Sequence, residues 1–191
     1  GAVAPAYQPS ARREQRNRRT IYAYRYRTLA DPLLEVFNKP TSDISCEQRD
    51  ETTVTPQVFA LFNSQFAADR ALAMAVNLEQ QAESSAEQIR QAFLLAYGRV
   101  PNAKELAACV QHVSKMETFH EAHPPEPREL PVLVEREMIE ELTGETFTFT
   151  EELDVMRDYE RDLKPWDVGP KTRALADLCL VLMNSNEFVY V

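Results

Sequence analysis

Residues 85–116 read SAEQIRQAFLLAYGRVPNAKELAACVQHVSKM and predict two consecutive helices. Ser85 to Gln88 is a capping box, after which apolar residues recur at helical spacing up to Tyr97. Gly98 supplies a left-handed stop, and Asn102 to Glu105 opens the next helix. Because the connection between the two helices is short, we expect them to form an antiparallel hairpin.

Cap signals and apolar spacing predict three further helices. They are a short helix after Asp31-Pro32, a long helix from Thr55-Pro56 to about Gln80, and a last helix from about Thr172 to Glu187. The last helix is expected to be the most buried, because apolar residues cover and widen one of its faces. Only four of the 191 residues are glycine, and strong helix formers abound. We therefore predict a mainly α fold, a helical bundle of about five to seven helices with a short N-terminal extended segment.

The extended segment is predicted over residues 20–27, where Tyr22, Tyr24 and Tyr26 alternate with Ile, Ala and Arg. A period of two favours a strand, whose tyrosines would face the core. A row of tyrosines also suits a platform that binds sugars, and the pattern leaves that alternative open.

Residues 132–165 predict a helix up to Gly144, a short extended turn at 146–150 and then a second helix. The outward faces of this segment carry many Glu and Asp residues, which indicate a solvated acidic face. Paired carboxylates also serve glycosidases or bind calcium, but the chain contains no Asp-x-Asp-x-Asp-Gly loop.

These patterns predict a disordered linker or arm at residues 1–17 and a single helical domain at 18–191, with an acidic extension at 125–167. Residues 1–30 contain seven arginines and one glutamate, whereas residues 125–167 contain fourteen Asp and Glu against five Arg and Lys. We expect the two charged segments to attract each other. The net charge of −9 opposes binding of nucleic acid by the arginine-rich arm.

Metal, redox and membrane signatures are missing from the sequence. His120 and His123 form an HxxH spacing at a helix end broken by prolines, which we interpret as two surface histidines rather than a metal site. Cys46, Cys109 and Cys179 contain no CxxC pair, and the last two lie on apolar helix faces. No stretch is long and apolar enough for a membrane span, and the start without Met indicates a piece of a longer polypeptide. We expect this chain to bind no cofactor.

The polar loop at residues 38–54 is the first candidate for a binding site, because loops of this length are often functional. The long helix after it carries Asn63, Arg70 and Asn77 seven residues apart on an otherwise buried surface. This stripe is either a solvated edge or a set of hydrogen-bond partners for the loop. The candidate ligand or interface residues are Arg19, Tyr22, Tyr24, Arg25, Arg49, Gln57 and Asn63. They contain no pair of nucleophile and base, so no catalytic residue is predicted.

Several short motifs occur together in this chain. They are Arg18-Arg19-Thr20-Ile21-Tyr22, Cys46 with Arg49, Thr55-Pro56-Gln57 to Leu61, Asn63-Ser64, Tyr97-Gly98-Arg99-Val100-Pro101 and Leu182 to Phe188. Over nearly all of residues 18–191 the chain resembles a C-terminal domain of unknown function in large exported planctomycete proteins. It departs from that family's pattern at Glu47-Gln48 and at Gln57 to Ala60.

The resemblance implies a context rather than a reaction. It implies export to the periplasm or cell surface, a haem-bearing c-type cytochrome module elsewhere in the parent polypeptide, and an association with polysaccharide breakdown. It implies no catalytic residues.

Three functions fit the residues and the resemblance. A structural or interaction domain that packs on upstream domains of the same polypeptide predicts an exposed apolar or aromatic patch near Tyr22, Tyr24 and Tyr26. A glycan-binding or catalytic accessory site predicts a concave pocket where the Cys46 loop meets the first long helix. A docking module for a c-type cytochrome predicts that the acidic residues 125–167 steer a basic haem edge, and that high salt weakens binding.

Overall fold

The computed structural model describes residues 9–23, 25, 31–40, 54–129 and 131–189. The chain divides into two compact units, Gly1–Thr52 with Arg128–Asp162 (unit 1) and Thr53–Pro127 with Leu163–Val191 (unit 2). Helices dominate the described residues as a whole, and the sheet that these residues form has two strands, so the mainly α fold class is confirmed. The domain boundary near residue 17 stays a prediction.

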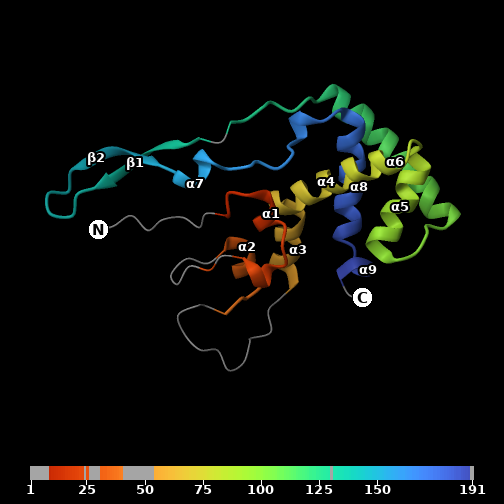
Figure 1. Ribbon diagram of the computed structural model, residues 1–191, viewed down its shortest axis with the longest axis horizontal. Coiled ribbons are helices and arrows are strands. Elements are labelled where there is room, and N and C mark those ends of the chain that lie inside the picture. The colour runs from red at the N-terminus through yellow and green to blue at the C-terminus, as the bar shows by residue number, and fades with distance from the viewer. Residues whose placement is uncertain (1–8, 24, 26–30, 41–53, 130, 190–191) are drawn as a thin grey trace. The chain divides into compact units, whose positions relative to one another are not determined.

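Unit 2 is a helical bundle built around one buried helix, α8 (Figure 1). Its elements are α3 (Val54–Asn63), α4 (Gln65–Gln81), α5 (Ser85–Tyr97), α6 (Ala103–Ala122), the 3-10 turn η2 (Pro165–Asp167), α8 (Pro170–Met183) and α9 (Asn186–Val189). Helices α4 and α6 both pack against α8, which has the most buried residues of any described helix, as predicted. Leu78, Ile89, Leu175 and Cys179 are the largest fully buried side chains, so the core lies between α4, α5 and α8.

The predicted helix pair α5 and α6 is present, and its two helices pack on each other. Gly98 ends α5 in the left-handed conformation (φ 69°), and Asn102 with Glu105 forms the capping box of α6, both as predicted. The start of α5 is one residue earlier than predicted: Ser84, not Ser85, accepts a hydrogen bond from the Glu87 backbone N–H at 3.3 Å. Either serine offers a capping hydroxyl, and the packing of α5 selects between them.

The single long helix predicted from Thr55 to Gln80 is wrong, because the chain breaks into α3 and α4 at Ser64. Ser64 has extended dihedrals, and its hydroxyl accepts from the Ala67 N–H at 3.2 Å. A serine side chain competes in this way for backbone groups that would otherwise continue the helix. Helix α3 already begins at Val54, so Thr55 lies inside the helix rather than at its N-cap.

The helix that follows the Cys46 loop is also less buried than predicted. Val58, Phe59 and Phe62 are exposed, Phe59 to 63%. Because Ser64 separates α3 from α4, Asn63 does not continue the helical face that carries Arg70 and Asn77. The interpretation of these three polar residues as one stripe is therefore wrong.

Unit 1 contains short elements and one β-hairpin. They are α1 (Arg13–Arg16), the 3-10 turn η1 (Thr20–Tyr22), α2 (Pro32–Val36), β1 (Leu133–Ile139), β2 (Thr146–Glu152) and α7 (Asp154–Arg157). Asp31 caps α2 as predicted, with its carboxylate accepting from the Leu33 N–H at 2.9 Å.

The extended segment predicted to start at Thr20 is wrong for its first three residues. Thr20–Tyr22 form a 3-10 turn, and Tyr22 is 68% exposed rather than facing a core. A period of two over so few residues does not outweigh local turn formation when no neighbouring strand is available to pair with. Tyr24 and Tyr26 lie outside the described residues.

The helix predicted before Gly144 is wrong, because Leu133–Ile139 form strand β1, paired antiparallel with β2 (Figure 1). Burial alternates along β1, with Val134, Arg136 and Met138 half-buried and the residues between them exposed. This period of two decides for a strand, since Met138 and Phe147 pair on one face. The extended conformation predicted at 146–150 is confirmed, and only Asp154–Arg157 of the second predicted helix forms.

The last helix also differs from its predicted length. It ends at Met183, and α9 forms a separate short helix in which Phe188 and Val189 remain exposed. Among the described residues, no helix combines the length and apolar character that crossing a bilayer requires.

Candidate functional site

The predicted site residues fall in both units, and the structure brings together only those that are close in the sequence. Arg19 and Tyr22 belong to one turn of unit 1, in which the Tyr22 N–H donates to the Arg19 carbonyl at 2.9 Å. Arg19, Tyr22 and Arg25 are exposed.

The other predicted site residues belong to unit 2 or are not described. Gln57 and Asn63 lie on α3, where Gln57 is half-buried and the Asn63 amide donates to the Phe59 carbonyl of its own helix at 3.0 Å. Tyr24, Cys46 and Arg49 lie outside the described residues, so a site at the Cys46 loop stays a prediction.

The attraction predicted between the arginine-rich and acidic segments occurs within unit 1. Arg13 and Arg16 each lie 3.5 Å from a carboxylate oxygen of Asp162. The Arg13 N–H donates to Glu160 at 3.0 Å, and the Arg16 guanidinium lies 4.1 Å from the centre of the Tyr159 ring. These contacts hold α1 to the segment after α7, which is a structural role.

A small pocket in unit 2 is lined by several charged side chains. We call it the His120 pocket; its volume is about 100 Å³. It is lined by Gln65, Ala68, Asp69, Ala71 and Leu72 of α4, His120 of α6, Pro165 of η2, and Arg173, Ala176, Asp177 and Leu180 of α8. Polar and apolar side chains from four elements therefore meet in one cavity.

On the α4 side of the pocket, Asp69 is a buried carboxylate. Lys164 Nζ donates to its two oxygens at 2.9 and 2.8 Å, and the Gln65 amide donates to Oδ1 at 2.8 Å. Both members of the Asp69–Lys164 ion pair are buried to about the same extent. The pairing compensates the desolvation of each charge and fixes the carboxylate in place.

On the α8 side, Asp177 holds the imidazole of His120, with His120 Nε2 lying 2.7 Å from Asp177 Oδ2. Because an ionised carboxylate only accepts, the imidazole donates in this contact. The interpretation of His120 as a surface histidine is therefore wrong, since its side chain is only 17% exposed. His123 is exposed and bonds the Phe119 carbonyl at 2.8 Å.

Arg173 also lines the pocket and is only 8% exposed. Its guanidinium donates to the carbonyls of Val168 at 2.9 Å, His120 at 3.1 Å and Pro165 at 3.2 Å. Its Nε has no hydrogen-bond partner within the described part of the chain. A buried N–H donor without an acceptor is costly, so this atom calls for an oxygen from water or a ligand.

The lining of the His120 pocket offers charged and hydrogen-bonding groups, from Gln65, Asp69, His120, Arg173 and Asp177. Its lining includes no serine, threonine, cysteine or lysine that could act as a nucleophile. Burial raises the pKa of the Cys179 thiol to about 12 and also raises the pKa of Cys109, so both remain thiols at neutral pH. Across the described residues, no three His, Cys, Asp or Glu side chains form a group suited to a metal ion.

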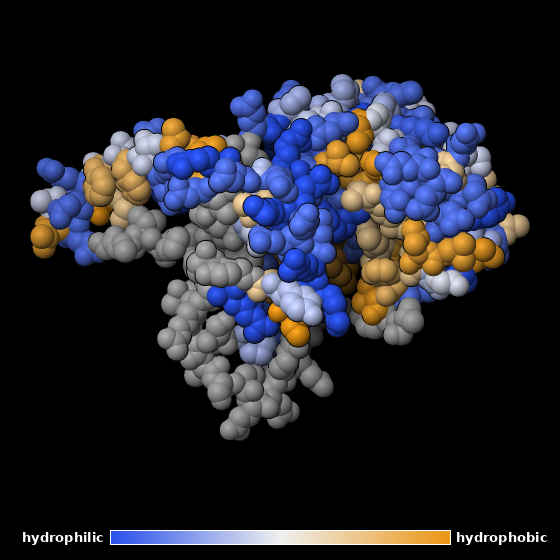
Figure 2. Space-filling view, in the orientation of Figure 1, coloured by the Kyte–Doolittle hydropathy of each residue, from blue (hydrophilic) through white to orange (hydrophobic). Residues whose placement is uncertain are grey.

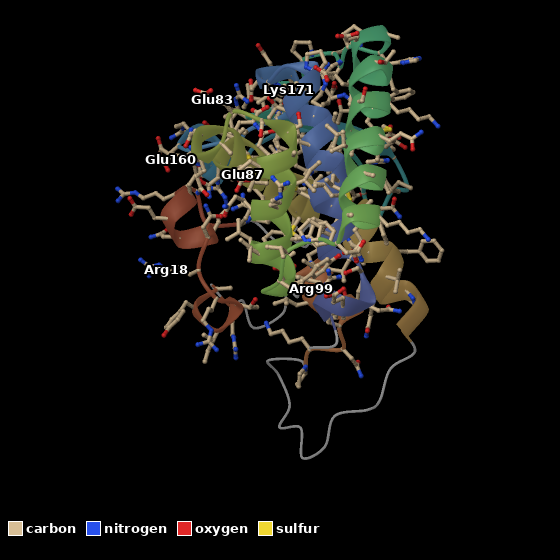
Figure 3. All side chains as sticks on the ribbon, turned by 90° about the vertical axis from the view of Figure 1, so that its right-hand side faces the viewer. Arg18, Glu83, Glu87, Arg99, Glu160 and Lys171 are labelled. Carbon is tan, nitrogen blue, oxygen red and sulfur yellow. The ribbon has the colours of Figure 1, made fainter. Side chains whose placement is uncertain are left out.

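A second charged cluster joins two of the short motifs at the other end of the bundle. Arg99 donates to Glu187 at 2.6 and 2.8 Å and to Glu105 at 2.9 Å (Figure 3). Hydrogen bonds from Arg99 lower the pKa of Glu187, and hydrogen bonds from Arg99 and the Asn102 N–H lower the pKa of Glu105 to about 2. The cluster ties the end of α5 to α6 and α9.

Beside this cluster, large apolar side chains of unit 2 face solvent. Figure 2 shows hydrophobic residues gathered over α5 and α9. We call this surface the α5–α9 patch; its exposed members are Leu94, Leu95, Val100, Phe188 and Val189. Helices α5 and α9 contact each other, so these exposed side chains lie on or next to adjoining elements.

The sequence patterns did not predict the His120 pocket, because its residues lie far apart along the chain. Asp69 and Lys164 are 95 residues apart, and His120 and Asp177 are 57 residues apart. The available signal was a charge within an apolar helix: Arg173 and Asp177 stand among the apolar residues of the last long helix. A charge in such a position needs a partner in the fold.

Comparison with known proteins places the chain in a family without assigning it a reaction. No curated protein and no solved structure matches it. The model of the family PSD1, Protein of unknown function (DUF1553), matches residues 2–113, more than half of the 191 residues, and the chain therefore belongs to this family.

Proposed function

We propose that this chain is an interaction domain of a larger exported protein, and that the α5–α9 patch packs against another domain of the same polypeptide. The observation that carries the proposal is the exposure of five large apolar side chains on adjoining elements. Burying a side chain of this kind in full contributes about 1.5–3 kcal/mol, so covering the patch would stabilise an interface by several times RT.

The position of the patch supports the same proposal. Arg99 and Glu187 lie among its members along the chain, and their ion pair holds α9 against the end of α5. An apolar centre with charged residues at its edge is the usual composition of a protein interface. In unit 1, Ile21 and Tyr22 are exposed beside Arg18 and Arg19, which supports a second contact surface near Tyr22.

The wider context belongs to the same proposal. It places the parent protein in the periplasm or at the cell surface of a planctomycete, with a c-type cytochrome module and a part in polysaccharide breakdown. The motifs Arg18 to Tyr22, Tyr97 to Pro101 and Leu182 to Phe188 support it by resemblance alone. Glycan binding by the Cys46–Asn63 region stays a prediction.

A second candidate function is electrostatic docking of the cytochrome module. Glu135, Glu137 and Glu152 are exposed on one face of the β-hairpin in unit 1. A row of carboxylates attracts a positively charged haem edge over roughly 10 Å at moderate salt, and higher salt screens the attraction.

The experiment compares binding of the full chain to the remaining domains of its polypeptide, supplied as a separate protein, by isothermal titration calorimetry. Leu95→Glu and Val189→Glu place charges in the patch and are expected to weaken binding at least tenfold, about 1.4 kcal/mol each. Leu142→Glu is the matched control, since Leu142 is 94% exposed on the hairpin loop of unit 1.

Equal affinities for the patch variants and the control would contradict the proposal. If neither patch variant weakens binding, salt weakens binding of the unmodified chain, and Leu142→Glu binds at least as tightly as the unmodified chain, the acidic hairpin is the docking surface instead. Thermal unfolding of each variant checks that the helical bundle is intact.

A further inference from the structure

We propose that the His120 pocket binds a vicinal diol, the group shared by small polyols and the edge of a sugar ring. This inference does not depend on the proposed interaction surface, because none of the pocket residues belongs to the α5–α9 patch.

The hydrogen-bonding groups of the pocket favour hydroxyls. Asp69 and Asp177 present carboxylate oxygens that accept, and Arg173 presents a buried Nε–H that lacks an acceptor among the described residues. A hydroxyl group donates one hydrogen bond and accepts others, so adjacent hydroxyls can serve both kinds of group at once. The unpartnered donor and the cavity are separate observations, and both involve Arg173, which lines the pocket.

The charges of the pocket disfavour ionic ligands. Asp69 is neutralised by Lys164, and Asp177 is held by His120. The charges of Asp69 and Asp177 are balanced by those of Lys164 and Arg173, so a ligand carboxylate or ammonium group would add an uncompensated charge and would also lose its water. A neutral polar ligand avoids both penalties.

The size and lining of the pocket set the size of the ligand. A volume of about 100 Å³ lies below the ~300 Å³ of sites for drug-sized ligands and near the ~150 Å³ cavity that holds benzene. The pocket therefore admits roughly four to six non-hydrogen atoms, which is a whole glycerol molecule or the diol edge of a sugar ring whose remainder stays outside. Ala68, Leu72 and Leu180 offer apolar surface to the carbon atoms of such a ligand.

The test follows the imidazole NMR signals of the full chain, with His112 and His123 as internal references outside the pocket. Glycerol and methyl glucoside are titrated as diol probes, and 1-propanol is titrated as a mono-alcohol of similar size. We expect a saturable shift confined to His120 with at least one diol, and no saturable shift with 1-propanol. Glycerol alone assigns the site to free polyols, and methyl glucoside alone assigns it to sugars.

Two variants fill or alter the pocket, and one serves as control. Ala68→Leu adds a branched side chain to the lining and is expected to weaken diol binding at least tenfold, whereas Ala108→Leu on the exposed face of α6 is expected to leave it unchanged. Asp177→Asn keeps a partner for His120 but removes acceptor capacity, so it is expected to weaken binding several-fold even if Ala68→Leu does not fold. An equal response to 1-propanol, unchanged binding in both pocket variants, or a pocket that takes up water alone would overturn the proposal.

Discussion

At the scale of single residues, Arg99 has the most extensive set of partners. It bonds Glu105, six residues away, and Glu187, 88 residues away, and its guanidinium lies 5.4 Å from the centre of the Phe93 ring. One planar guanidinium with five donors can serve two carboxylates at once, which a lysine could not do with the same geometry. Arg99 thus explains why the motifs around Tyr97 and Glu187 occur together.

The Arg99 cluster predicts a loss of stability in acid. Folding lowers the pKa of Glu105 from its usual 4.5 to about 2 and also lowers that of Glu187, so the unfolded chain binds more protons than the folded chain between these values. The stability from these groups is fully present above pH 4.5 and is lost as pH falls towards 2. Thermal unfolding between pH 6 and pH 2 is expected to show this loss in the unmodified chain and a shallower loss in Arg99→Leu. Parallel pH profiles for the two proteins would contradict it.

At the scale of elements, Ser64 separates helix α3 from helix α4. Its hydroxyl caps α4, and its extended backbone ends α3. Without the cap, the Ala67 N–H would depend on water alone. The same residue type has no such effect at Ser114, in the interior of α6, where the residue is exposed.

Replacing the cap is therefore expected to destabilise unit 2. Ser64→Ala should lower the free energy of unfolding by about 1 kcal/mol, the usual cost of losing an N-cap side chain. Urea unfolding followed by circular dichroism measures the difference, with Ser114→Ala as a control expected to be neutral or slightly stabilising because alanine favours a helix interior. A Ser64→Ala variant as stable as the Ser114→Ala control would show that packing alone breaks the helix.

At the scale of the whole molecule, each unit is assembled from two separate stretches of the chain. In the sequence, the hairpin segment of unit 1 is inserted between α6 and α8, two helices that pack together in unit 2. The core of unit 2 therefore forms only when residues on both sides of this segment meet, as Leu78 and Leu175 do in the core cluster. Such long-range contacts favour cooperative unfolding of the unit.

Alkylation of Cys179 is expected to report that unfolding. Its thiol is fully buried in the core cluster, and burial raises its pKa to about 12, so it reacts only when the core opens. Peptide-resolved mass spectrometry after iodoacetamide treatment along a urea series should show Cys179 modified in step with loss of helical signal, and Cys109 modified at lower urea. Rapid modification of Cys179 in native buffer would contradict the burial.

The predicted site residues and the residues of the His120 pocket differ in their distance along the chain. Gln57 and Asn63 follow a polar loop in the sequence, and Arg19 and Tyr22 lie beside and within the predicted extended segment. Each of these predictions therefore rests on neighbours in sequence. The pairs Asp69–Lys164 and His120–Asp177 have no such local signature. They form because a charge inside a packed helix must find its partner on whichever helix lies beside it.

The sequence alone determined the mainly α class, the α5–α6 pair with its Gly98 stop and Asn102 cap, the cap of α2 and the burial of α8. These features depend on hydrogen bonds and apolar periodicity within a few turns, so local residues suffice. Tertiary structure decided the strand pairing of Leu133–Ile139 and the meeting of four elements at the His120 pocket. Both depend on contacts between segments that are distant in the sequence, and local sequence patterns do not encode such contacts.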